Sequence, residues 1–281
     1  MKYAVIGDRG LFGAEMVQLL RQYDEKVQGF NRDNLNLEKV TLTDLAGLLS
    51  KFDVVVNAIG YTNVELAEIE RDKAFHANAF LASKLANACS VANVRFFHIS
   101  TNFVFSGKME TPYKISSEMD ALNTYGISKA WGEKLIGISG AESTIFRTAW
   151  LYGEFGNCFP AVVLKRIAEL GSISIVDDQF GQPTWTRDLA EQVFQYSRIP
   201  ERVNIVHAVA SGQTSWANFA HEILCSSPFA ETGHVTEISS TEYPSRVQRP
   251  IRAVLDNRSS LVPPIADWLS RWNVASAFMN K

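Results

Sequence analysis

The chain has 281 residues, 46% of them hydrophobic and 20% charged, which is the composition of a globular protein and excludes a disordered chain. The formal net charge of −3 excludes a general attraction to nucleic acid or to anionic membranes. The three cysteines fit no metal-binding spacing, no apolar run approaches the ~18 residues of a membrane helix, and the N-terminal sequence enters a strand pattern directly. We therefore expect a cytoplasmic protein with no nucleic-acid or membrane partner.

The first half of the chain alternates short apolar runs with stretches of helical periodicity. The predicted buried strands are 3–7, 26–30, 53–58, 94–100 and 143–148, and the predicted helices are 11–23, 42–51, 71–92 and 124–138. Strands that alternate with helices predict an α/β fold, here a Rossmann-like doubly wound parallel sheet. Such a sheet binds its ligand at the carboxyl ends of the strands.

After about residue 150 the alternation loosens. We predict a strand and turn over 172–185, a helix over 186–197 capped by Thr186, a strand over 204–210 and a further helix capped by Thr214. The Pro- and Ser-rich residues 226–264 predict a loop-rich region. We expect a main domain over 1–150, to which the chain returns near 184–210, and a smaller C-terminal α/β substrate lobe formed by 151–183 and 211–281.

A glycine-rich turn joins the first strand to the first helix. The segment GDRGLFG places Gly7, Gly10 and Gly13 in a G-x-x-G-x-x-G pattern, with Leu11 and Phe12 between them. Glycines let the backbone approach a pyrophosphate closely, and the unpaired N–H groups of the helix N-terminus face its charge. The pattern predicts that 1–150 is a dinucleotide-binding domain, and a close-packed turn without a ligand is the alternative.

The end of the second strand bears on the choice of cofactor. An acidic residue there would hold the ribose 2′-OH of NAD, but the chain has Asn31 and Arg32, followed by Asp33. Arginine can bind a 2′-phosphate bidentately. We therefore favour NADPH, while Asp33 leaves NADH open.

The third strand ends in the small residues of VVVNAIGYT. Asn57, Ala58, Ile59, Gly60 and Tyr61 would let the backbone pass against the cofactor, and Asn57 could satisfy backbone groups at the strand end. A tight loop at a sheet edge is the alternative interpretation.

A hydroxyl, a phenol and an ammonium are expected to converge at the end of the fourth strand. Thr101 ends that strand, and Tyr125 and Lys129 lie one turn apart on the next helix. A ketone that accepts hydride must also receive a proton, and a nearby ammonium should lower the pKa of the phenol. We predict Tyr125 as the proton donor, with Lys129 also holding the ribose and Thr101 positioning the carbonyl. His98 is interpreted as a packed strand residue.

Together these signals resemble the extended short-chain dehydrogenase/reductase superfamily, and within it the dTDP-4-dehydrorhamnose reductase family. The resemblance covers nearly the whole chain. The segments that carry it include GLFG (10–13), ISTNFVFSG (99–107), YGISKAWGE (125–133), FRTAWLYG (146–153), IVDDQFGQPT (175–184) and RPIRAVLDN (249–257).

The resemblance implies NAD(P)H-dependent reduction of the 4-keto group of a nucleotide-activated 4-keto-6-deoxy sugar. It gives the catalytic roles to Thr101, Tyr125 and Lys129, as the residues alone do. It also implies that Trp150 and the segment around Asn157 lie near the sugar, in a sugar-nucleotide-binding lobe, and that Arg249 contacts the diphosphate. A homodimer is left open.

Two positions depart from the family pattern. The family often has Thr-Asp-Tyr at the strand end, where this chain has Thr101, Asn102 and Phe103. We expect Asn102 and Phe103 to face the substrate and to influence which sugar is accepted.

The remaining titratable residues are not assigned to chemistry. Some family members bind magnesium through glutamates; Glu15 matches one such position, but Arg187 stands where another is expected, so no metal site is predicted. The acidic residues between 65 and 72 are interpreted as a solvated charged face.

Three alternatives remain beside the reductase. A nucleotide-sugar epimerase would use the same tyrosine–lysine pair with a permanently held cofactor. A dehydratase would need an acid after Thr101, which Asn102 does not supply. A regulatory subunit with this fold would bind a partner enzyme without turnover.

Overall fold

The structure, a computed structural model, describes residues 1–245, 247–258 and 261–279. A parallel sheet in the order β10-β5-β4-β3-β1-β2 forms its centre. Its strands are β1 (Lys2–Ile6), β2 (Lys26–Phe30), β3 (Val54–Asn57), β4 (Arg95–Thr101), β5 (Ser143–Thr148) and β10 (Ile205–His207). The order reverses at β1, so the carboxyl ends of β1 and β3 lie side by side at the switch point. The predicted doubly wound sheet is confirmed.

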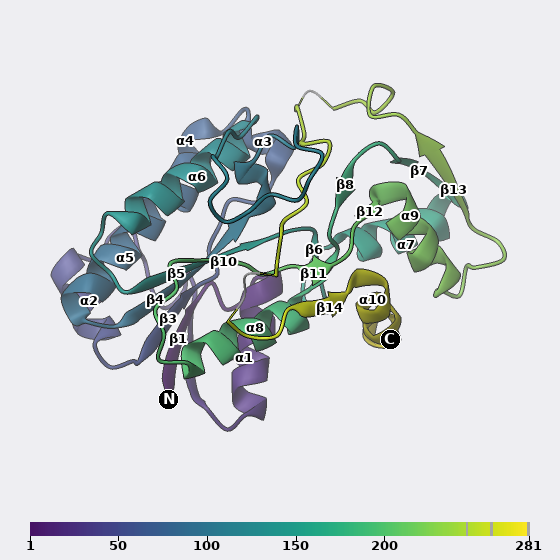
Figure 1. Cartoon of the computed structure of the whole chain (residues 1–281). Coiled ribbons are helices and arrows are strands. Elements are labelled where there is room, and N and C mark those ends of the chain that lie inside the picture. The colour runs from purple at the N-terminus through teal and green to yellow at the C-terminus, as the bar shows by residue number, and fades with distance from the viewer. Residues whose placement is uncertain (246, 259–260, 280–281) are drawn as a thin grey trace.

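Helices cover both faces of this sheet (Figure 1). The helices on one face are α1 (Leu11–Gln22) and α8 (Thr186–Arg198), and those on the other are α2 (Leu42–Leu49), α5 (Leu81–Ala92) and α6 (Thr124–Gly137). Tyr3 and Val5 of β1 pack in the core under α1 and α8, whereas Ala4 and Ile6 pack in the core under α2 and α5. Both faces of the strand are buried, which explains why its sequence is an uninterrupted apolar run.

The predicted helix 71–92 contains a widened turn. It runs as α4 (Arg71–Phe75), a π-helical turn η1 (His76–Phe80) and α5, and a short helix α3 (Val64–Ala67) precedes it. Asn78 in η1 accepts a hydrogen bond from the Tyr61 amide at 2.8 Å and donates to the Ser128 hydroxyl at 2.9 Å. The π turn therefore ties the loop after β3 to α6.

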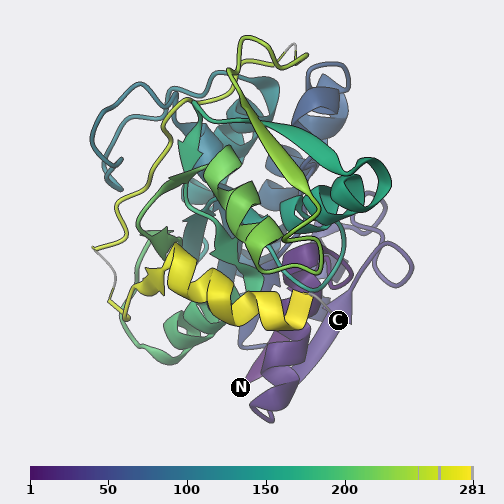
Figure 2. The same ribbon diagram turned by 90° about the vertical axis from the view of Figure 1, so that its right-hand side faces the viewer.

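The second lobe is built on a parallel strand pair and three helices. The pair is β7 (Ser172–Val176) with β13 (His234–Ile238), and the helices are α7 (Phe159–Leu170), α9 (Trp216–Cys225) and α10 (Trp268–Met279). Tyr152, Phe219 and Trp272 meet in its core with ring centroids 5.4–5.5 Å apart. Figure 2 shows α10, in yellow, along the side that faces the viewer.

Short elements connect this lobe to the central sheet. They are η2 (Asn102–Val104) and the pairs β6 (Leu151–Tyr152) with β9 (Thr184–Trp185), β8 (Phe180–Gly181) with β12 (Thr214–Ser215), and β11 (Ala210–Ser211) with β14 (Ile265–Asp267). Within the three described ranges, no helix has the length and apolarity that crossing a membrane requires.

Two predicted helix caps are wrong by one residue. Trp185, with extended backbone, occupies the cap of α8, and Thr186 is the first helical residue. At α9 the hydroxyl of Ser215, rather than that of Thr214, accepts from the Asn218 amide at 3.1 Å. Helix α8 thus begins one residue earlier than predicted, whereas β12 continues one residue past the predicted cap of α9. The predicted strand 204–210 likewise divides, because β10 ends at His207 and Ala210 pairs with β14.

Two glycines of α6 offer a matched test of its packing on η1. A Cβ at Gly132 would lie 2.2 Å from the backbone oxygen of Asn78, whereas a Cβ at Gly137 would meet nothing within 4 Å. We expect Gly132→Ala to lower the free energy of unfolding by about 1–3 kcal/mol because backbone must shift. Gly137→Ala should raise it by up to about 1 kcal/mol, since alanine favours a helix. Urea denaturation measures both changes, and equal stabilities would contradict the close packing.

Candidate active site

The glycine-rich turn forms a close-fitting cradle at the carboxyl end of β1. Gly7 has a φ of 96°, and a Cβ there would lie 3.1 Å from the carbonyl carbon of Ala58. A Cβ on Gly13 would lie 2.0 Å from the Gly7 oxygen, and Gly10 begins α1 as its cap residue. The turn can approach the loop after β3 and the first turn of α1 because these side chains are absent. A cradle that a Cβ would fill fits a dinucleotide pyrophosphate.

The residues between the glycines connect the cradle to its surroundings. Phe12 is buried in the core under α1 and α8, and Leu11 packs against the core of the second lobe. A Cβ on Gly156, next to the exposed Asn157, would lie 4.0 Å from the Leu11 amide nitrogen. The segment around Asn157 therefore lies beside the N-terminus of α1.

The loop after β2 carries Arg32 and lies beside Arg9 of the glycine turn. Asn31 donates to Asp8 of the glycine turn at 3.0 Å and accepts from the Asp33 amide at 2.9 Å. The Asp33 carboxylate forms an ion pair with Arg9 at 2.5 Å, and Arg32 is exposed. Asp33, which left NADH open, is thus paired with a cation. Arg9 was not predicted from the sequence as a cofactor-binding residue, because only the fold brings the glycine turn beside this loop.

Asn57 ends β3 and satisfies a backbone group there, as predicted. Its Oδ1 accepts from the Ile59 amide at 3.0 Å, and its Nδ2 lies 2.9 Å from Nδ1 of His98. Further along the loop, past Gly60, the Tyr61 hydroxyl donates to Glu70 at 2.6 Å, which raises the pKa of Tyr61 to about 12.

The prediction that the acidic residues between 65 and 72 form a solvated face is wrong for Glu65 and Glu68, whereas Asp72 is exposed. Glu68 accepts from the amide of Thr124 at 2.7 Å and from its hydroxyl at 2.9 Å, at the start of α6. Glu65 pairs with Arg249 at 2.9 Å and accepts from the Ser245 hydroxyl at 2.7 Å. These carboxylates hold separate segments together, which spacing along one helix could not reveal.

Thr101, Tyr125 and Lys129 meet at the carboxyl end of β4. Asn123 caps α6 by accepting from the Gly126 amide at 2.9 Å, which begins the helix just before Tyr125. The Tyr125 phenol lies near Thr101, whose hydroxyl acts to lower its pKa, and one turn before Lys129. Lys129 is 4% exposed, and its Nζ donates to the backbone oxygen of Ile99 at 2.6 Å. The structure thus brings the three predicted residues together.

The predicted lowering of the tyrosine pKa is not found. Burial raises the pKa of Tyr125, and the nearby Thr101 hydroxyl only partly opposes the shift. Burial also lowers the pKa of Lys129 to about 8, against the field of Glu133. The prediction considered only the charge of Lys129, whereas the folded chain also buries this side chain.

A buried ion pair fixes α6 to the sheet beneath these residues. Glu133, one turn after Lys129, accepts from the Arg147 guanidinium at 2.7 and 3.1 Å, and both side chains are 2% exposed. The Ser100 hydroxyl donates to the same carboxylate. Helix α6 is therefore joined to β4 and β5 directly below the tyrosine and lysine.

The two departures from the family pattern have different surroundings. Asn102 is buried and donates to the backbone oxygen of Ala253 at 2.9 Å, so its amide supports the segment that follows Arg249. Phe103 is half-buried and lies edge to face with Tyr125, with ring centroids 5.6 Å apart. Phe103 thus contacts the reactive phenol, whereas Asn102 acts on a neighbouring segment.

Trp150 lies where the sheet meets the second lobe. It has a φ of 46°, and its ring stacks on Trp216 with centroids 3.5 Å apart. A Cβ on Gly181 would lie 2.3 Å from the Trp150 ring. These contacts hold the indole against the second lobe.

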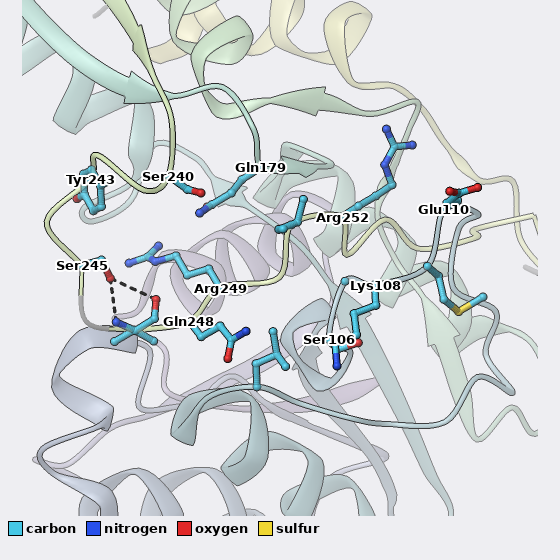
Figure 3. Close-up of a pocket in the computed structure, with 15 residues that line it drawn as sticks. Ser106, Lys108, Glu110, Gln179, Ser240, Tyr243, Ser245, Gln248, Arg249 and Arg252 are labelled. Atoms are coloured by element: carbon cyan, nitrogen blue, oxygen red, sulfur yellow. Dashed lines mark hydrogen bonds between the residues drawn. The ribbon is translucent and has the colours of Figure 1, made fainter.

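A cavity of about 880 Å³ opens between the lobes (Figure 3). Its basic side chains are Lys108, Arg249 and Arg252, with Glu110 the acid among its lining residues. Arg249 was predicted from the family resemblance to contact the diphosphate. Lys108 and Arg252 were missed, since they come from loops whose positions the sequence does not set. Leu122, three residues before Tyr125, also lines the cavity, which places its inner end near the start of α6.

Glu15, which matches one position of the magnesium site of some family members, forms an ion pair with Arg187. Their atoms are 3.3 Å apart and join α1 to α8. Burial raises the pKa of Glu15, and Arg187 opposes that shift. Within the described ranges, no group of three or more His, Cys, Asp and Glu side chains could hold a metal ion.

The doubly wound parallel sheet and its likeness to solved structures place the chain in the extended short-chain dehydrogenase/reductase superfamily. Residues 1–272 match the family described as the RmlD substrate binding domain. The chain is 34% identical to the spore coat polysaccharide biosynthesis protein SpsK of Bacillus subtilis, over 92% of this chain and 90% of that one. The chain belongs to the RmlD substrate binding domain family.

Two further relatives carry a named activity. A dTDP-4-dehydrorhamnose reductase of Burkholderia thailandensis is 32% identical over 92% of this chain and 91% of its own length. The structure of dTDP-4-dehydrorhamnose reductase from Bacillus anthracis in complex with NADP has a TM-score of 0.89 and 26% identity, over 98% of this chain and 99% of that one.

The lowered pKa of Lys129 predicts a pH dependence of stability. An unfolded lysine titrates near 10.5 and the folded one near 8, so between these values the unfolded chain binds more protons. The stability of the protein relative to Lys129→Met should therefore rise with pH, by up to about 3 kcal/mol between pH 8 and 10.5. Denaturation of both proteins across this range measures the difference, and a difference independent of pH would contradict the shift.

Proposed function

We propose that the chain reduces the 4-keto group of a nucleotide-activated 4-keto-6-deoxy sugar, as a dTDP-4-dehydrorhamnose reductase-like enzyme. The observation that carries the proposal is the Tyr125 phenol, placed near Thr101 and one turn from the buried Lys129, at the sheet edge that also holds the glycine cradle. The names of the relatives support the same reaction. Residues 1–150 with 184–210 would form the dinucleotide domain and the rest the sugar-nucleotide lobe.

NADPH, when bound, supplies the hydride. Gly7, Gly10 and Gly13 would hold its pyrophosphate, and residues 57–61 would pass along it at the end of β3. Arg32, with Arg9 beside it, supports a 2′-phosphate better than a free 2′-hydroxyl, because each guanidinium can donate two hydrogen bonds to a phosphate. Asn31 holds the loop that carries Arg32.

Tyr125 donates a proton to the carbonyl oxygen of the substrate, which gains negative charge when hydride is added to the ketone. Its raised pKa keeps the phenol protonated at neutral pH, which is the state that reduction of a ketone consumes. Thr101 orients the phenol and the substrate oxygen, and Phe103 presents an apolar edge next to them. Trp150 and Asn157 would lie on the side of the sugar that faces the second lobe.

The cavity between the lobes supports binding of the nucleotide diphosphate. Arg249, Lys108 and Arg252 place three cations around it in a protein whose net charge is −3. Glu65 already pairs with Arg249, so an incoming phosphate would exchange one anionic partner of Arg249 for another. The three cysteines, free in the structure, fit the expected cytoplasmic location.

Replacing the proton donor tests the proposal. We expect Tyr125→Phe to lower the rate of NADPH oxidation with dTDP-4-dehydrorhamnose by at least about 100-fold, because the hydroxyl that donates the proton is lost. The surface change Tyr23→Phe serves as the control and should retain the rate. NADPH titration by fluorescence should show unchanged affinity in both variants. A wild-type rate in Tyr125→Phe would contradict the role.

The alternatives have distinct outcomes in the same assay. An epimerase would isomerise a nucleotide sugar without net NADPH oxidation, which NMR of the products detects. A regulatory subunit would oxidise NADPH with none of a panel of nucleotide 4-ketosugars.

The cofactor preference rests on the loop after β2. Removing the guanidinium in Arg32→Ser should raise the KM for NADPH by about tenfold, the effect of losing one charge-assisted contact, and leave the KM for NADH within about twofold. Steady-state kinetics with the two cofactors provide the comparison. Equal changes for both would show that Arg32 does not contact the 2′-phosphate.

A further inference from the structure

Asn123 contacts both parts of the candidate site through one buried side chain. Its Oδ1 accepts from the Gly126 amide at 2.9 Å, which caps α6, and its Nδ2 donates to the backbone oxygen of Gln248 at 3.0 Å. The residue is 3% exposed. Asn123 stands two positions before Tyr125, and Gln248 directly precedes Arg249. A single amide therefore joins the start of the proton donor's helix to the segment that carries the cavity arginine.

The two backbone groups fix the orientation of this amide. The Gly126 N–H can only donate and the Gln248 carbonyl can only accept, so the Asn123 oxygen faces the first and its NH₂ group faces the second. Aspartate and serine cap helices as well as asparagine does. Aspartate, however, has no N–H group, and the single oxygen of serine is occupied at the cap. The contact with Gln248, and not the cap, is therefore what requires asparagine at this position.

Two carboxylates of α3 and its C-terminal cap complete a closed ring of contacts. Glu65, in the first turn of α3, pairs with Arg249 at 2.9 Å. Glu68, at the C-terminal cap, accepts from the amide of Thr124 at 2.7 Å and from its hydroxyl at 2.9 Å. Helix α3, the start of α6 and residues 248–249 thus each contact the other two. A shift of one of these three segments would break contacts with both of the others.

Among the described residues, Asn123 binds the backbone of this segment directly beside Arg249. Another buried amide, that of Asn102, donates to the oxygen of Ala253, four residues after Arg249. Figure 3 shows Gln248 and Arg249 following one another along the wall of the cavity. The place of the guanidinium therefore depends on the contact at Gln248 more directly than on the contact at Ala253.

We propose that Asn123 is a positioning residue that holds Arg249 at a fixed place relative to Tyr125. The inference rests on the proposed function for the roles of these two residues, which are diphosphate binding and proton donation. A sugar nucleotide carries its diphosphate and its ketone at a set separation, so the site must present Arg249 and Tyr125 at a matching one. Asn123 supplies that match, because the same side chain begins the helix of Tyr125 and anchors the residue before Arg249.

Replacing asparagine by serine separates the cap from the contact with Gln248. In Asn123→Ser we expect the Kd for dTDP to rise about fivefold, because loss of the hydrogen bond leaves the binding-competent place of Arg249 populated about a fifth of the time. The Kd for NADPH should stay within about twofold, since other segments form the glycine cradle. Isothermal titration calorimetry measures both constants.

The chain offers a matched control in a second asparagine cap. Asn63 is exposed and caps α3 by accepting from the Leu66 amide at 2.9 Å. Because serine keeps a helix cap, Asn63→Ser should leave the Kd for dTDP within about twofold of wild type. An unchanged Kd in Asn123→Ser, or an equal rise in both variants, would overturn the proposal.

A double-mutant cycle separates the positioning of Arg249 from a merely structural role. In the Arg249→Gln protein the cation is absent, so adding Asn123→Ser should change the Kd for dTDP by less than about twofold. Equal losses of affinity with and without Arg249 would overturn the proposal. If Asn123→Ser does not fold, Asn123→Asp takes its place, because aspartate keeps the cap and lacks the donor.

Hydrogen exchange tests whether Asn123 connects the two parts of the site. Saturating dTDP should slow exchange of the backbone amides at 124–130 in the wild-type protein and leave it unchanged in Asn123→Ser. Protection that persists in the variant would reach α6 by another route and would overturn the proposal.

Neither measurement requires turnover, so this inference and the proposed function fail separately. A chain that shows the expected changes in dTDP binding but reduces no nucleotide 4-ketosugar contradicts the proposed reaction alone. A chain that reduces the sugar, while Asn123→Ser binds dTDP as tightly as wild type, contradicts only the role of Asn123. A wild-type chain that does not bind dTDP contradicts both.

Discussion

The buried ion pair between Glu133 and Arg147 is the interaction on which the candidate site depends. Tyr125, Lys129 and Glu133 follow one another at intervals of one helical turn and so lie on one face of α6. Anchoring Glu133 to the sheet therefore orients the face that carries Tyr125 and Lys129. Both partners are removed from water, and the pair is stable because the bidentate guanidinium and the Ser100 hydroxyl satisfy the carboxylate. Helix α6 can then approach the sheet closely enough to bury the lysine.

The parts of the site that follow from local spacing could be predicted from the sequence. The glycine turn, the strand-end threonine and the tyrosine–lysine pair each lie within one strand–helix unit, and the parallel sheet brings their ends together. Arg9, Lys108 and Arg252 could not be predicted, because their places depend on how separate loops pack. Single-residue errors at Thr186 and Thr214 have a related cause, since the short strands that precede those helices are formed by pairing with distant segments.

The protonation states of Tyr125 and Lys129 also could not be predicted from the sequence. A lysine four residues after a tyrosine suggests an ammonium beside a phenol, but burial of both changes which protonation states are stable. The loop after β3 then matters for a reason that its small residues do not reveal. Asn57 accepts from the Ile59 amide of that loop and contacts the buried His98. The His98 Nε2 lies 3.2 Å from the Lys129 Nζ. The protonation states of Tyr125 and Lys129 depend on how the sheet and α6 pack together.

The contacts of Glu65, Asn102 and Asn123 with residues 248–253 have a consequence for biosynthesis. Most of the central sheet and the whole glycine turn lie in the first 150 residues, but one wall of the cavity is supplied by a segment that is translated well after them. A nascent chain can therefore form its cofactor cradle well before it can enclose a sugar nucleotide. The order of translation thus separates the two halves of the site in time.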